Sequence, residues 1–109
     1  MIINFDKIEE QIIPNFKGGE KETALRICDN ESKRIMRGKL QNGASIGMHT
    51  HDTNSEIIFV THGSGHIIYD GERLPLHAGE CHYCPQGHTH SLINDTSDTL
   101  EFFAVVQQQ

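Results

Sequence analysis

The spacing of apolar residues constrains this chain more than any other feature of its sequence. They occur in short runs separated by glycine, proline, asparagine and aspartate, and no long stretch has the period of an amphipathic helix. Short apolar runs bounded by turn residues are typical of strands, so the sequence predicts an all-β sandwich or barrel. The expected strands cover residues 23–28, 33–41, 56–62, 65–70, 80–84, 90–94 and 99–106.

Helix content is expected to be low, because only residues 5–13 have a spacing that would suit a helix. Phe5, Ile8 and Ile12 could share one helical face, but the same residues could equally form an edge strand. Both interpretations stay open. Residues 14–22 are expected to form a loop before the main body of the protein, and Asp70-Gly71 predicts the tight turn of a hairpin.

Length and charge limit the classes of protein to consider. The 109 residues suit one domain over residues 1–109. A net charge of −6 and the lack of a long basic run argue against binding to the nucleic-acid backbone. The sequence has no secretory signal pattern and no apolar run long enough to span a membrane. We therefore expect a cytoplasmic protein with neither a nucleic-acid nor a membrane partner.

The three cysteines are an odd number in a chain without an export signal, so we expect free thiols. Cys81 and Cys84 form a CxxC pattern, which in other contexts serves redox chemistry or zinc binding. On a strand, an offset of three residues places two side chains on opposite faces. We therefore expect one of these cysteines in the core and the other outside, with a thiol facing a substrate cavity as the alternative.

Eight histidines are unusual in so short a chain, and histidine is the commonest metal ligand. On a strand, His49 and His51 point to the same side, and a turn over residues 52–55 could bring Glu56 beside them. His90 follows a later turn and offers a further imidazole. A lone pair of this kind is more often solvated or hydrogen-bonded than metal-binding, so this pattern by itself leaves both possibilities open.

Two blocks of sequence, residues 43–63 and 79–94, resemble the two motifs of the cupin superfamily. All the defining positions match in order and spacing. In the first block these are Gly43, His49, His51, Glu56 and Gly63, and in the second Gly79, Pro85, Gly87, His90 and Asn94. The chain thus resembles a small single-domain cupin. The resemblance implies a double-stranded β-helix, or jelly-roll, barrel in which His49, His51, Glu56 and His90 bind one divalent ion.

Three imidazoles and one carboxylate suit several transition metals. Fe²⁺ or Mn²⁺ is expected first, because mixed nitrogen and oxygen ligation with open positions suits an ion that binds substrate or O₂, while Zn²⁺, Ni²⁺, Co²⁺ and Cu²⁺ stay open. Imidazole ligands also need partners that orient them, and Asn94 is the candidate for this role.

The alternation of side chains along the strands predicts which residues surround the site. The expected pocket walls are Ile58, Val60, Leu92, Phe102 and Ala104. His82 and Tyr83 point in opposite directions, so one of them should face the cavity and could act as a general acid or base. The sequence does not choose between the two.

The resemblance implies a metal-dependent enzyme that acts on a small polar molecule, as a dioxygenase, isomerase, decarboxylase or lyase. One alternative is a metal-anchored module that binds a sugar or carboxylate without catalysis, and another is a barrel kept for its structure alone. The resemblance also implies a homodimer formed through outer strands. The sequence does not identify the substrate.

Overall fold

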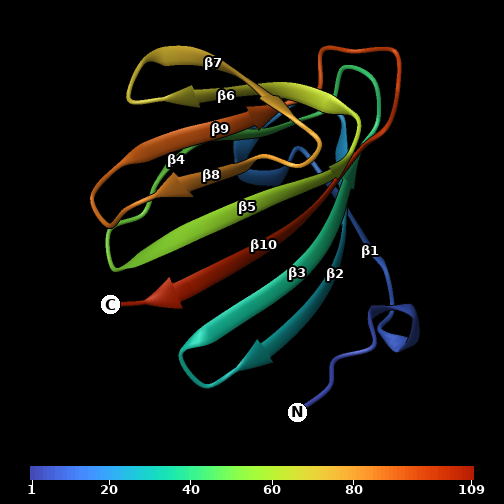
Figure 1. Ribbon diagram of the computed structural model, residues 1–109, viewed down its shortest axis with the longest axis vertical. Coiled ribbons are helices and arrows are strands. Elements are labelled where there is room, and N and C mark those ends of the chain that lie inside the picture. The colour runs from blue at the N-terminus through green and yellow to red at the C-terminus, as the bar shows by residue number, and fades with distance from the viewer.

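The computed structural model describes residues 1–109 as two antiparallel β-sheets packed face to face (Figure 1). The jelly-roll arrangement expected for a cupin is thereby present. The strands are β1 (Gln11–Pro14), β2 (Glu22–Asn30), β3 (Lys33–Leu40), β4 (Ser45–Thr50), β5 (Asn54–His62), β6 (Ser64–Tyr69), β7 (Glu72–His77), β8 (Cys81–Cys84), β9 (Thr89–Ile93) and β10 (Leu100–Gln108), and two 3-10 turns are η1 (Phe5–Lys7) and η2 (Phe16–Gly18).

The order of the strands follows from a chain that alternates between the two layers. The larger sheet has the order β1-β2-β3-β10-β5-β8, and the smaller one has the order β4-β9-β6-β7. From β3 onward the chain crosses repeatedly from one sheet to the other, so strands that are distant in sequence become neighbours. This winding places the two motif-bearing segments, β4–β5 and β8–β9, at the same end of the barrel.

The core forms because alternate residues of each strand face the opposite sheet. On β10, Leu100, Phe102 and Ala104 are buried, whereas Glu101 and Phe103 between them are partly exposed. Alternation of this kind buries one face of a sheet and leaves the other toward solvent. Fully burying one such large apolar side chain contributes about 1.5 to 3 kcal/mol to folding.

Gly38 on β3 makes room for the largest buried side chain. A Cβ atom at Gly38 would lie 2.3 Å from the tip of the Phe102 ring, and Phe102 is only 1 % exposed. The two residues are paired across β3 and β10. The ring therefore lies directly over the glycine, and any side chain at this position would displace it.

The structure differs from the expected set of strands at several points. It adds two strands, β4, which bears His49, and β7. The strand β7 lies at the edge of the smaller sheet and contains Pro75, whose missing N–H costs least at an edge. Of residues 5–13, the first part is η1 and the last part enters β1, which pairs only with β2. The edge-strand interpretation thus holds for the second half of that segment. The segment expected as a loop includes η2.

The hairpin between β6 and β7 turns at the position expected from the sequence. Asp70 and Gly71 both have positive φ, 48° and 86°, as a tight two-residue hairpin turn requires. None of the helical segments is long and apolar enough to cross a bilayer.

Candidate metal centre

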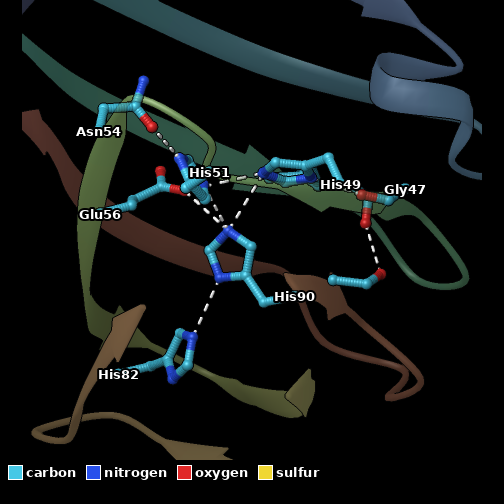
Figure 2. A network of polar contacts seen from close by, with 9 residues as sticks. Gly47, His49, His51, Asn54, Glu56, His82 and His90 are labelled. Atoms are coloured by element: carbon cyan, nitrogen blue, oxygen red, sulfur yellow. Dashed lines mark hydrogen bonds and ion pairs between the residues drawn. The ribbon is translucent and has the colours of Figure 1, made fainter. Parts of the chain in front are cut away.

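Three imidazole nitrogens and one carboxylate oxygen meet at one end of the barrel interior (Figure 2). The Nε2 atom of His90 lies 3.1 Å from Nε2 of His49 and 2.9 Å from Nε2 of His51. The Oε1 atom of Glu56 lies 3.0 Å from Nε2 of His90, 3.1 Å from that of His51 and 4.0 Å from that of His49. The smaller sheet supplies His49 and His90, and the larger sheet supplies Glu56.

Local backbone structure brings these side chains together. His49 on β4 and His90 on β9 are directly paired across the two strands, and a register shift between Ile46 and His49 interrupts the pairing just before them. Such an irregularity re-aims the side chains that follow it. The turn between β4 and β5 then returns the chain so that Glu56 faces the imidazoles from the opposite sheet.

The distances between the donor atoms fit a shared metal ion. Donor atoms held about 2.1 Å from one ion lie about 3.0 Å apart when their bonds meet at a right angle and about 3.4 Å apart at the tetrahedral angle. Four of the measured separations lie between 2.9 and 3.1 Å. The cluster could therefore bind a metal ion.

Each imidazole is also held through its other ring nitrogen, as Figure 2 shows. Nδ1 of His49 lies 2.7 Å from the carbonyl oxygen of Gly47, and Nδ1 of His51 lies 2.5 Å from the Asn54 side-chain oxygen. Nδ1 of His90 lies 3.0 Å from Nε2 of His82. When each Nδ1 carries the proton, it donates to these partners and leaves Nε2 free to coordinate a metal.

Asn94, the residue expected to orient the imidazoles, hydrogen-bonds none of them. It is fully buried and donates through Nδ2 to the carbonyl oxygens of Leu40 and Asp98, while its Oδ1 accepts from Thr96. Asn94 thus stabilises the loop between β9 and β10. The amide that orients a histidine is Asn54 instead, and no sequence signal beyond its closeness to His51 indicated this.

The carboxylate of Glu56 is ionised despite its burial. Burial acts to raise the pKa of Glu56, but the neighbouring imidazoles of His49, His51 and His90 together hold it well below its usual range. Conversely, burial lowers the pKa of His90, which favours its neutral form. The hydrogen bond to Glu56 raises the pKa of His51, so a metal ion that binds here would displace any proton from the Nε2 atom of this imidazole.

A cavity of about 490 Å³ opens from this cluster. Buried apolar side chains from both sheets form its walls, and polar residues of the β2–β3 hairpin, together with Lys17, form its rim. The apolar wall residues are Phe16, Leu25, Met36, Ile46, Ile58, Leu92, Phe102 and Val106. A cavity with apolar inner walls and polar groups that converge at its inner end is a usual form of a small-molecule site.

Comparison with known proteins places the chain in a family. Residues 36–106 match the model of the cupin domain. The chain belongs to the cupin family. This cupin is 30 % identical over 112 residues to an oxalate-binding protein from Thermotoga maritima. The aligned region covers 97 % of this chain and 93 % of the relative.

Solved structures agree with this assignment. A predicted oxalate decarboxylase from Thermotoga maritima superimposes with a TM-score of 0.94 at 29 % identity, over 100 % of both chains. A cupin 2 conserved barrel domain protein from Salinispora arenicola gives a TM-score of 0.74 at 25 % identity, over 99 % of this cupin and 88 % of that chain. The resemblance to the cupins and the all-β fold expected from the sequence are thereby confirmed.

The expected pocket residues divide into two groups in this cupin. Ile58, Leu92 and Phe102 line the cavity, whereas Val60 and Ala104 are buried in the core and do not reach it. Sequence reasoning missed Phe16 and Lys17, because they belong to the segment expected as a loop. Phe16 is the only large apolar residue of that segment, which was the one signal available.

His82 and Tyr83 do point in opposite directions, but neither lines the cavity. Tyr83 is 55 % exposed on the outside of the barrel. His82 is buried, does not line the cavity, and lies on the side of His90 opposite to the other three donor residues (Figure 2). Burial lowers the pKa of His82 to about 4, so it is neutral at pH 7. Its position suits an acceptor for the His90 N–H better than a proton donor to substrate.

The two cysteines of the CxxC pattern lie as expected. Cys84 is buried and Cys81 is exposed, and neither lines the cavity. Burial raises the pKa of Cys84 to about 11. At neutral pH this residue is therefore a protonated thiol packed in the interior, not a nucleophile.

Proposed function

We propose that this cupin binds one divalent transition-metal ion through His49, His51, Glu56 and His90 and uses it to hold a small carboxylate anion in the cavity. The convergence of four donor atoms at the inner end of a cavity carries this proposal. Fe²⁺ and Mn²⁺ are the first candidates, because both accept mixed nitrogen and oxygen ligands and would keep positions open for a ligand. Zn²⁺, Ni²⁺, Co²⁺ and Cu²⁺ remain candidates for the same donor set.

Charge supports an anionic ligand. A divalent ion with Glu56 as its one anionic protein ligand keeps a net positive charge in a largely buried position. An unbalanced buried charge is costly, and an anion that completes the coordination offsets it. The ammonium of Lys17 lies on the cavity rim and adds to the attraction. The names of the two relatives from Thermotoga maritima, which refer to oxalate, point to the same chemical class.

Turnover of the bound acid is the second candidate function. It is favoured by the likeness to a predicted oxalate decarboxylase and by a set of only four protein donor atoms, which would leave room on a bound ion for the acid. When bound, such an ion supplies Lewis-acid chemistry to a carboxylate or carbonyl group. The residues of the chain would bind and orient the acid, and the apolar walls would limit the access of water.

Titration calorimetry with oxalate tests the binding proposal. The protein is stripped with chelator, reloaded with Mn²⁺ and compared with the stripped form and with a His49→Ala/His51→Ala variant treated in the same way. Oxalate is expected to bind the loaded protein at least about 100-fold more tightly than the other two samples, since the ion supplies most of the attraction. Equal oxalate affinity with and without Mn²⁺ would contradict the proposal.

A further inference from the structure

The cavity is much larger than oxalate. Its volume is about 490 Å³, whereas the six heavy atoms of oxalate would occupy at most about 180 Å³ if each took the volume of one water molecule in the liquid. An oxalate ion held at the cluster would leave most of the cavity to water. The cavity therefore suits a ligand that extends beyond the group bound next to the histidines.

The inner walls of this remaining space are apolar, whereas its rim is polar. Ile46 and Leu92 contribute from the smaller sheet, and Met36, Ile58 and Phe102 contribute from the larger one. All five are at most 8 % exposed. Water beside such walls gains few hydrogen bonds, whereas an apolar group placed there is removed from water and stabilised. The part of the ligand that extends from the cluster should thus be a hydrocarbon group.

The charge of the cluster favours one carboxylate over two. A divalent ion and the Glu56 carboxylate together carry one positive charge, which a singly charged acid neutralises. A dianion would leave an excess negative charge next to apolar walls, where an uncompensated charge is unfavourable. Three cations on the rim, Lys17, Lys33 and Arg34, could compensate a second carboxylate, but all three are exposed and lie away from the apolar inner walls.

We propose, resting on the function proposed above, that the cavity takes a 2-oxo or 2-hydroxy monocarboxylic acid that bears a branched or extended apolar side group. Such an acid offers the same pair of neighbouring oxygen atoms as oxalate with a single negative charge. Its oxygens face His49, His51, Glu56 and His90, and its side group packs against Met36, Ile58 and Phe102. The apolar wall is then the specificity determinant of the site.

Calorimetric titration of Mn²⁺-loaded protein with oxalate, pyruvate and 2-oxo-4-methylpentanoate tests this inference. Each additional buried methylene should tighten binding about four-fold, so the longer oxo acid is expected to bind at least about ten-fold more tightly than pyruvate, and more tightly than oxalate. Equal affinities for pyruvate and the longer acid, with oxalate still bound, would overturn this inference and leave the proposed function intact. Failure of all three acids to bind would overturn both.

A pair of variants on β10 tests whether the cavity wall sets the preference for the longer oxo acid. Val106 lines the cavity and is half-buried, whereas its neighbour Val105 faces the outside of the larger sheet. Val106→Phe narrows the space for the side group, so the preference for 2-oxo-4-methylpentanoate over pyruvate should fall at least about five-fold. Val105→Phe should keep that preference within about two-fold. An equal loss in both variants, with unchanged melting temperatures, would contradict a specificity role for the cavity wall.

Discussion

The Nδ1 atom of His90 lies 3.0 Å from the Nε2 atom of His82, in a buried position behind the cluster. Because burial lowers the pKa of His82 to about 4, its ring stays neutral and can accept the His90 N–H. That contact fixes the tautomer of His90 with Nε2 free toward the other donors. His82 is thus a positioning residue in this account, although it touches neither the cavity nor its contents.

Replacing His82 separates this positioning role from simple packing. His82→Phe removes the acceptor while keeping a ring, and metal affinity is expected to fall about 10- to 100-fold. His82→Gln keeps an acceptor oxygen and should stay within about five-fold of the parent. Competition with a chromophoric chelator measures both affinities. Equal losses in the two variants would mean that His82 only fills space.

Metal retention should decrease on acidification. An imidazole with a protonated Nε2 cannot coordinate, and the ordinary pKa of histidine is about 6.5. The affinity for the metal ion therefore falls as the pH drops through about 6, and it recovers as the pH rises. Dialysis at a series of pH values followed by metal analysis gives the profile. Full metal occupancy at pH 5 would speak against histidine ligation.

Gly38→Ala should destabilise the barrel. The added Cβ would lie 2.3 Å from the Phe102 ring, so this buried ring would have to leave its packed position. Overpacking of this kind costs about 1 to 3 kcal/mol of the free energy of unfolding. Urea denaturation measures the loss. Lys39→Ala, at the neighbouring half-exposed position, is the control and should change the free energy by less than about 0.5 kcal/mol.

The homodimer expected from the cupin resemblance remains a prediction. The outer face of the larger sheet carries one continuous apolar row across neighbouring strands, formed by Ile35, Val105, Ile57 and Tyr83. Light scattering at micromolar concentration should give the mass of two chains, and Tyr83→Glu should reduce it to one. Leu74→Glu, at an exposed apolar residue of the other sheet, should leave the dimer intact. A single-chain mass for the parent protein would refute the prediction.

The sequence predicted those features that depend on local pattern. Alternating apolar residues revealed the core face of β10, and Asp70-Gly71 revealed the hairpin turn. The spacing of His49, His51, Glu56 and His90 matched a known motif, and these four side chains do lie together in the structure.

Features that depend on packing between distant strands were not accessible from the pattern. The alternation of side chains along a strand indicated that His82 and Tyr83 point in opposite directions, but only the folded barrel shows that the His90 ring lies between His82 and the other donor residues. For the same reason the sequence misplaced Asn94, whose partners on other segments become neighbours only after folding. Lys17 lies on the cavity rim and has a positive φ, a backbone conformation that is not expected for a lysine.

Elemental analysis of the protein expressed without added metal shows directly whether the cluster of three histidines and Glu56 binds a metal ion. A His49→Ala/His51→Ala variant is prepared identically, with His62→Ala as a control because His62 is an exposed histidine outside the cluster. We expect about one transition-metal ion per chain in the parent and in His62→Ala, and none in the double variant. Equal metal content in the parent and the double variant would contradict it.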